Sequence, residues 1–248
     1  MKNILFLGAL FFLSVSCLNQ GAKRLEQQMK EKAENDSIVV VKKPFADDPK
    51  KTEYEIPVLK GTSLRHGVQK RYYPHGSVYS EIPYIRNERN GIAYTYYKAY
   101  RNEKPAVWKE QIYVHGKLNG ICKRYYSDGK LQAEYEYKEG MPAIGLKEYS
   151  ESGKELKMPV LTVKSNPASN YYYVTARLSE SNNNVTYYMG NLVEGKYMPD
   201  DLKRIQERDG IAEVLIPHNE TIHSVTIVAV FMTSLSNECI LAKTISLN

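Results

Sequence analysis

The chain has 248 residues, of which 42% are hydrophobic and 11% aromatic, and it contains 21 tyrosines but a single tryptophan. Its formal charge of +6 is uneven: residues 61–158 hold 17 Lys and Arg against 11 Asp and Glu, whereas residues 159–248 hold 7 against 9. This asymmetry indicates an anionic partner for the middle of the chain, unless the cations only protect exposed sheet edges. The three cysteines form no C-x-x-C pair, which excludes a common type of zinc or redox site.

The first sixteen residues have the pattern of an export signal. Lys2 is followed by an apolar run over residues 4–13, then by three small residues and Cys17. The run is too short to span a bilayer as a helix, but it suits a secretory signal. The end of the segment resembles a bacterial lipoprotein signal, in which Cys17 is the lipidated first residue, although Ser14 stands where a branched aliphatic residue is usual. The alternative is an ordinary signal with an incidental cysteine. The resemblance implies a chain anchored in the bacterial cell envelope, at the outer membrane.

Residues 17–60 are expected to form a flexible tether. A charged, weakly helical run over residues 23–34 is followed by a brief strand at 38–41 and a polar stretch at 42–51. So few large apolar side chains cannot bury enough surface to offset the entropy of ordering the segment. A partner helix at residues 23–34 is the alternative.

One short phrase recurs four times in the middle of the chain, at residues 66–76, 90–100, 119–129 and 144–153. Each copy opens with Gly67, Gly91, Gly120 or Gly145, and in three copies an aromatic pair follows about five residues later. A second turn, such as Asp128-Gly129, then precedes another strand-like run. Glycine at turns and Asp-Gly between such runs indicate β-hairpins copied in tandem. Residues 61–158 are therefore predicted to form an antiparallel β-meander of about four hairpins.

These residues resemble the MORN-repeat-variant family of tandem β-hairpins, rich in Gly and Tyr, some of whose bacterial members are described as antitoxin components. The resemblance covers about ninety residues. It implies an elongated sheet used for binding, with no catalytic residues to carry over. The second copy departs from the pattern through a longer insert around residues 101–108, and the fourth has the single Tyr149.

Residues 159–248 are predicted to form a β-sandwich-like domain. Six β-branched or aromatic runs alternate with Pro, Ser and Asn clusters, which is typical of short strands joined by turns. One short helix is expected at residues 200–207, because Pro199 precedes it, acidic residues open it and Gly210 follows its end.

The sequence contains no motif that indicates catalysis. No nucleophile elbow, phosphate loop, metal-ligand spacing or paired carboxylates appear, so we expect no enzyme activity, no cofactor, no metal and no nucleic-acid partner. The favoured function is a lipid-anchored binding or scaffold protein of the envelope with a glycan, peptide or envelope partner. The alternatives are an antitoxin-like or immunity-type protein that neutralises a toxin, and an envelope hydrolase with a site assembled from both domains.

Repeated basic and aromatic residues are the candidate binding site. Lys-Arg-Tyr-Tyr occurs at residues 70–73 and again at 123–126, and strand alternation places the Lys and the first Tyr on one face. Rows of tyrosine beside a basic row either hold a thin sheet together or stack on the rings of an acidic glycan. The candidate ligand-binding residues are Lys70, Arg71, Tyr72, Tyr73, Tyr96, Tyr97, Trp108, Lys123, Arg124, Tyr125 and Tyr126.

Overall fold

The computed structural model describes residues 27, 37–99, 104–180, 185–218 and 222–247. The chain divides into two units between Leu131 and Gln132, not between residues 158 and 159 as expected. The predicted signal peptide, the lipidation site Cys17 and nearly all of the charged run at 23–34 lie outside the described residues. Within the described part of the chain, no helix is long and apolar enough to cross a membrane.

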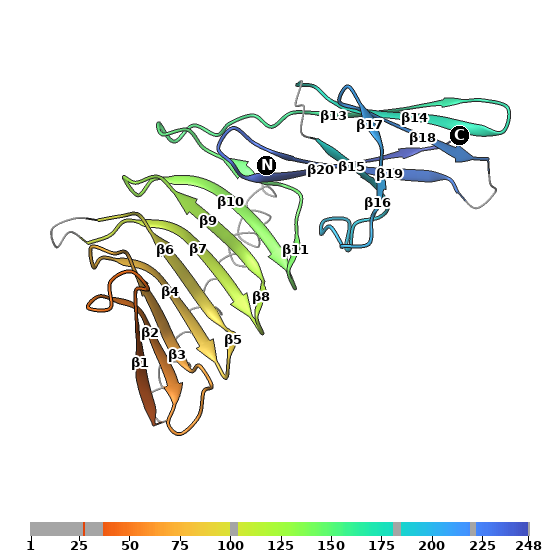
Figure 1. The fold of residues 1–248 in the computed structure, drawn as a ribbon. Coiled ribbons are helices and arrows are strands. Elements are labelled where there is room, and N and C mark those ends of the chain that lie inside the picture. The colour runs from red at the N-terminus through yellow and green to blue at the C-terminus, as the bar shows by residue number, and fades with distance from the viewer. Residues whose placement is uncertain (1–26, 28–36, 100–103, 181–184, 219–221, 248) are drawn as a thin grey trace, which may run out of the picture. The chain divides into compact units, whose positions relative to one another are not determined.

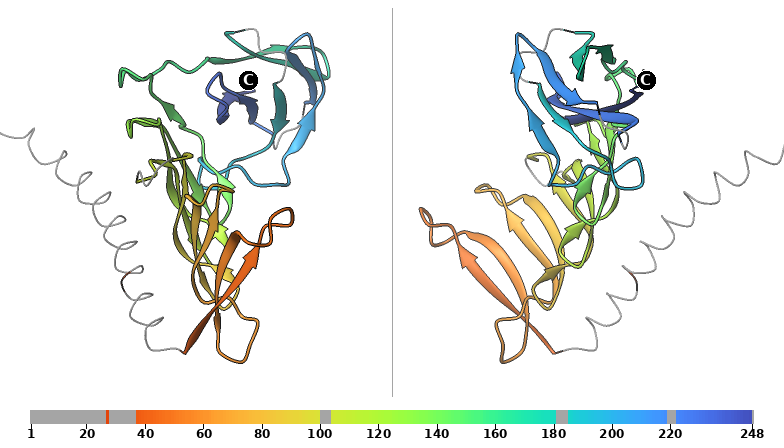
Figure 2. Two further views of the ribbon diagram at one scale, coloured as in Figure 1. Left: turned by 60° about the vertical axis from the view of Figure 1, so that its left-hand side comes forward. Right: turned by 90° about the vertical axis from the view of Figure 1, so that its right-hand side faces the viewer.

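The first unit is an antiparallel sheet whose strands lie side by side in one layer (Figures 1 and 2). Its strand order is β1-β2-β3-β4-β6-β7-β9, with β5 paired to β4 and β8 paired to β7. This confirms the predicted meander. The strands are β1 (Ile38–Pro44), β2 (Thr52–Leu59), β3 (Gly67–Tyr72), β4 (Val78–Ile85), β5 (Glu88–Arg89), β6 (Gly91–Tyr96), β7 (Val107–Val114), β8 (Lys117–Leu118) and β9 (Gly120–Tyr125).

Two kinds of turn repeat along this sheet. The opening glycines have positive φ, from 94° at Gly145 to 115° at Gly91, as the sequence pattern predicted. Gly91, Gly120 and Gly145 each follow a two-residue hairpin turn in which both central residues have positive φ, namely Arg86-Asn87, His115-Gly116 and Glu139-Gly140. Turns of this kind match the right-handed twist of the flanking strands, so they fix the register of each repeat.

The sheet begins at Ile38, so the expected tether is wrong for residues 38–59. Strand β1 pairs with β2 along its whole length, and β2 pairs with β3 through Tyr54 opposite Arg71 and Glu55 opposite Lys70. Strand β2 is itself a repeat strand, because it shares Glu-Ile-Pro with β4 at residues 55–57 and 81–83. Trp108 also differs from expectation, since it lies in β7 and not in an irregular insert.

The second unit contains short strands of the repeat region and two four-stranded sheets. Strand β10 (Leu131–Lys138) pairs with β11 (Met141–Pro142) and β12 (Lys147–Glu148). The two sheets have the orders β13-β14-β18-β17 and β16-β15-β19-β20. Their strands are β13 (Leu161–Pro167), β14 (Tyr171–Leu178), β15 (Thr186–Met189), β16 (Lys203–Ile205), β17 (Glu207–Arg208), β18 (Ile211–Pro217), β19 (Ser224–Met232) and β20 (Glu238–Ser246).

One hydrophobic core joins the elements of the second unit. It contains Val174 of β14, Tyr187 of β15 and Ile227 of β19 together with Ala133 of β10, which is why the unit begins before residue 158. The hydroxyl of the fully buried Tyr187 donates to the carbonyl oxygen of Gly210 at 2.9 Å, so its polar end is satisfied inside the core.

The short helix predicted at residues 200–207 is wrong. From Ser37 onward, no described residue is helical. Instead β16 pairs with β15, and Ile205 enters the core while Arg204 remains exposed. Asp209 and Gly210 both have positive φ, of 53° and 74°, and form the hairpin between β17 and β18. The glycine interpreted as a helix end is thus a hairpin-turn glycine.

Candidate functional site

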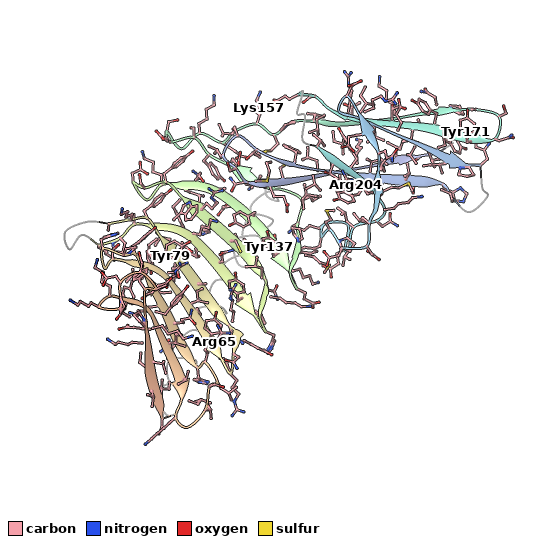
Figure 3. The ribbon with its side chains drawn as sticks, viewed as in Figure 1. Arg65, Tyr79, Tyr137, Lys157, Tyr171 and Arg204 are labelled. Atoms are coloured by element: carbon pink, nitrogen blue, oxygen red, sulfur yellow. The ribbon has the colours of Figure 1, made fainter. Side chains whose placement is uncertain are left out.

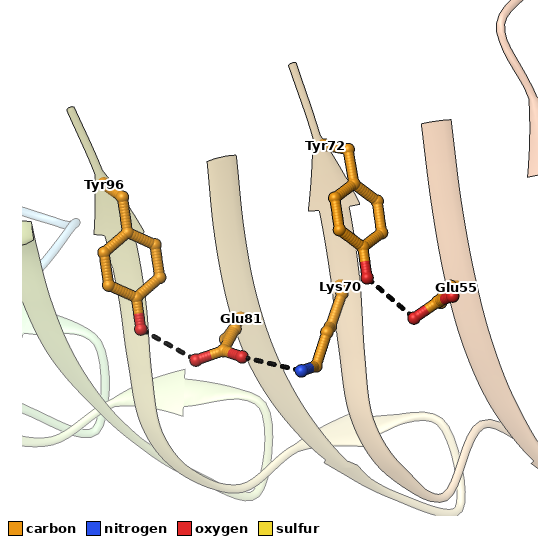
Figure 4. Close-up of polar contacts among 5 residues, drawn as sticks. All are labelled: Glu55, Lys70, Tyr72, Glu81 and Tyr96. Atoms are coloured by element: carbon orange, nitrogen blue, oxygen red, sulfur yellow. Dashed lines mark hydrogen bonds and ion pairs between the residues drawn. The ribbon is translucent and has the colours of Figure 1, made fainter. Parts of the chain in front are cut away.

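One face of the first unit carries a row of alternating charges and tyrosines (Figure 4). The Tyr72 hydroxyl donates to Glu55 Oε2 at 2.7 Å, and the Tyr96 hydroxyl donates to Glu81 Oε2 at the same distance. Lys70 Nζ lies 3.1 Å from Glu81 Oε1, between the two. Each first tyrosine of a pair therefore reaches back to the glutamate of the preceding repeat.

The row keeps Glu55 ionised and its tyrosines neutral. The hydrogen bond from Tyr72, followed by that from Lys42, lowers the pKa of the Glu55 carboxyl below its usual value. Burial, and then the hydrogen bond to the neighbouring carboxylate, raises the pKa of Tyr72 and Tyr96. Because Lys70 alternates with acids, the expected basic row does not exist on this face. These contacts stabilise the sheet and neutralise its charge.

The second tyrosines of the pairs bind the backbone of the next repeat. The Tyr73 hydroxyl donates to the carbonyl oxygen of Tyr96 at 3.0 Å, and the Tyr97 hydroxyl donates to that of Tyr125 at 2.8 Å. The Tyr126 N–H closes the turn to Lys130 at 2.8 Å. The tyrosine pairs thus hold consecutive repeats together. Of the two roles considered from the sequence, holding the sheet together and stacking on a ligand, these contacts correspond to the first.

A bulge places an aromatic ring beside a cation at one end of the sheet. Arg71 pairs with Ser80 and Tyr72 pairs with Val78, so Tyr79 is the bulged residue without a partner on β3. Its ring lies 5.2 Å from the Arg71 guanidinium. Bulges re-aim side chains in this way. Arg71 also lies over Tyr54 and is held by Glu53, with Nη2 2.9 Å from Oε1.

The same bulge recurs two strands further along and forms a second cluster. Thr95 pairs with Lys109 and Tyr96 pairs with Val107, so Trp108 is the bulged residue without a partner on β6. Lys109 Nζ lies 4.2 Å from the Trp108 ring centroid, and Arg124 Cζ lies 5.6 Å from it. The Tyr97 ring lies 6.2 Å from Trp108. Of the predicted site residues, Tyr97, Trp108 and Arg124 are brought together here; we call them, with Lys109, the Trp108 cluster.

Lys123 and Tyr125 do not join this cluster. Lys123 lies opposite Glu110, on the face of the charge row, and the Tyr125 hydroxyl lies 3.4 Å from Glu110 Oε2. Strand alternation separates Lys123 from Arg124, because successive side chains point to opposite faces. The Lys-Arg-Tyr-Tyr phrase is therefore split between two surfaces with different roles.

Sequence reasoning missed three features of the sheet. Lys109 was not selected because it lies outside the repeated phrase, although the shared glutamate at 81 and 110 aligns its strand with β4. The guanidinium of Arg65 lies 4.2 Å from the Tyr84 ring centroid, near the opposite end of the strands from Tyr79 (Figure 3). The guanidinium of Arg89 lies 5.2 Å from the Tyr113 ring centroid. These stacks bury large rings at the hairpin end. The glutamate row was the third feature missed.

The described residues offer no other obvious chemistry. No group of three or more His, Cys, Asp or Glu side chains among them is placed to hold a metal ion. Cys122 and Cys239 are free and buried, and burial raises their thiol pKa to about 11 and about 12. Glu148 is buried, but Thr233 and Asn237 donate to it at 2.5 and 2.6 Å, which is a structural contact.

Comparison with known proteins identifies the repeats and no more. The family described as MORN repeat variant matches residues 65–86 and 118–139, and these segments contain β3 with β4 and β9 with β10. Strands β6 and β7 lie between the matched segments and continue the same meander, with the same bulge as β3 and β4. No curated protein and no solved structure matches the chain.

Proposed function

We propose that this chain is a non-catalytic binding or scaffold protein whose repeat sheet is the interaction surface. The observation that carries the proposal is the difference between the two faces of the first unit. On one face, Lys70 is neutralised by Glu81 and the tyrosine hydroxyls are bonded to carboxylates. On the other face, Lys109 and Arg124 gather at a single indole ring.

The second face is suited to an acidic partner that also carries flat apolar rings. Cations near an aromatic ring attract anionic groups, while the ring offers an apolar plane for stacking. Charge alone gives an attraction that salt screens within about 8 Å at physiological ionic strength, so stacking supplies the salt-resistant part. An acidic glycan combines both features, and we propose it as the partner class.

Export and anchoring complete the proposal, and they rest on the sequence alone. The apolar run at residues 4–13 and the small residues before Cys17 suit a lipoprotein signal. We propose that Cys17 is lipidated and that the folded units are held at the membrane of the bacterial envelope. A single acyl chain binds membranes only marginally, so stable anchoring requires the full lipid modification.

Two experiments test this proposal. Replacement of Cys17 by Ser followed by cell fractionation should move the protein from the membrane to the soluble fraction; unchanged membrane association would refute lipidation at Cys17. Binding is tested on the full chain carrying Cys17→Ser, with a panel of acidic polysaccharides and their neutral counterparts. Adding Lys109→Gln and Arg124→Gln should reduce binding strongly. The matched pair Lys70→Gln and Lys123→Gln, with the same loss of charge on the opposite face, should not.

A further inference from the structure

The first strand of the repeat sheet has an open edge. Strand β1 begins the order β1-β2-β3, and within the described part of the chain no strand pairs with its outer side (Figure 1). Residues 39–44 are all exposed, and the three valines at 39, 40 and 41 are 46%, 51% and 41% exposed. Proteins protect such an edge with Lys, Pro or a bulge. Here these features stand only at the end of the strand, at Lys42, Lys43 and Pro44, so the apolar run before them is open.

The register with β2 determines which backbone groups of β1 face outward. Val40 lies opposite Pro57, which has no N–H, and the Pro57 carbonyl oxygen accepts from the His66 N–H at 2.9 Å on the other side of β2. The Val40–Pro57 pair is therefore a non-hydrogen-bonded pair, and Val40 directs its N–H and C=O away from β2. Because this pattern alternates along a strand, Ile38 and Lys42 do the same. Three residues thus present backbone donors and acceptors to an incoming strand.

The charges next to this edge indicate an acid on the incoming strand. Cations and acids alternate along a row of register partners in β1 to β4, namely Lys42, Glu55, Lys70 and Glu81. Lys42 Nζ lies 3.0 Å from Glu55 Oε1, and the row ends at the open edge with this lysine, whose side chain is 64% exposed. Opposite charges directly across two strands stabilise a sheet, and like charges destabilise it. An acid opposite Lys42 would continue the alternation by one more strand.

A second lysine and the charge of the unit favour the same kind of partner. Lys43 is exposed on the other face of β1, and among the described residues no acid forms an ion pair with it. Residues 37–131 hold 18 Lys and Arg against 9 Asp and Glu. A second copy of this basic unit would therefore be repelled, whereas an acidic segment would be attracted.

We propose that β1 is a docking edge for an extended acidic segment of another protein. The segment adds to the sheet as an antiparallel strand, with acids opposite Lys42 and Lys43 and β-branched residues opposite the three valines. The backbone hydrogen bonds supply affinity, and the charges and valines set the register. This surface is the edge of the sheet and not its face, so the inference goes beyond the proposed glycan binding and does not depend on it.

A synthetic strand tests the proposal. The probe is an acetylated and amidated peptide, Thr-Glu-Glu-Val-Thr-Val-Thr, whose glutamates lie opposite Lys43 and Lys42 when it runs antiparallel to β1. It is titrated by calorimetry into the full chain carrying Cys17→Ser, and the control peptide has lysine in place of both glutamates. We expect saturable binding of the acidic peptide that weakens as the salt concentration rises. The lysine peptide should bind at least about tenfold more weakly, because it places like charges opposite each other.

Two variants of one residue locate the peptide on β1. Val40→Pro removes an outward N–H without removing a bond to β2, and edge strands tolerate proline, so it should weaken peptide binding about tenfold or more. Val40→Thr keeps the N–H and the β-branched shape, and it should change binding less than about twofold. Lys43→Gln should weaken binding and its dependence on salt, whereas Lys117→Gln, with the same loss of charge on β8, should not.

Other outcomes overturn the inference. No heat with the acidic peptide, or equal affinity for the lysine peptide, would show that the edge does not take an acidic strand. Peptide binding that survives Val40→Pro would place the peptide elsewhere on the protein. Self-association in sedimentation that Val40→Pro abolishes would assign the edge to a second copy of this chain. Unchanged urea midpoints of the variants exclude unfolding as the cause. Binding of acidic polysaccharides should be the same with and without Val40→Pro, so the two proposed surfaces are tested separately.

Discussion

Replacement of Tyr96 by Phe should destabilise the first unit by removing one hydrogen bond and nothing else. The Tyr96 hydroxyl donates to Glu81 Oε2 at 2.7 Å, well within the range for a charge-assisted bond. Hydrogen bonds to charged groups contribute about 1.5–3 kcal/mol. The Glu81 side chain is 28% exposed and keeps its ion pair with Lys70, so we expect the lower end, about 1.5 kcal/mol.

Tyr79→Phe is the matched control, because it removes the same atom from a nearby ring. No hydrogen bond joins the Tyr79 hydroxyl to another described residue, and the ring contacts with Tyr73 and Arg71 survive the change. Its cost should stay below about 0.5 kcal/mol. The assay is urea unfolding followed by Trp108 fluorescence, which reports the first unit separately because the second unit lacks tryptophan. If both variants lose equal stability, the bond to Glu81 does not hold the repeats together.

Two further results are expected. The pKa of Glu55 is lowered in the folded state, so the stability that its carboxylate provides is present above its unfolded pKa and is lost as the pH falls below about 4.3. The urea midpoint should therefore decrease between pH 5 and pH 3, and it should decrease less in Tyr72→Phe, which lacks the hydrogen bond to Glu55. An equal decrease in both proteins would contradict this role of Glu55. In a Cys17→Ser chain, neither Cys122 nor Cys239 should react with an aromatic disulfide reagent at pH 8 until urea unfolds the protein, and rapid labelling of the folded chain would show that the thiols are accessible.

The sequence determined the repeat sheet because its turns are local. Positive φ at Gly91 and Gly120 needs no distant contact, and the strands between such turns alternate every two residues. The same local logic failed at Gly210, since a glycine after a short polar run suits both a helix end and a hairpin. Pairing of β16 with β15 decided between them, and that pairing joins residues far apart in sequence. Short segments take their structure from packing when their own propensity is weak.

Only the tertiary structure could assign roles to the repeated residues. Lys70-Arg71 and Lys123-Arg124 belong to the same repeated phrase in the sequence. The side chains that each of these cations contacts, however, are set by the neighbouring strand. Glu53 faces Arg71, whereas Trp108 and Lys109 face Arg124, because antiparallel register brings together residues fifteen or more positions apart. A repeat fixes its own fold through local turns, but its charge balance depends on cross-strand partners that no single copy contains.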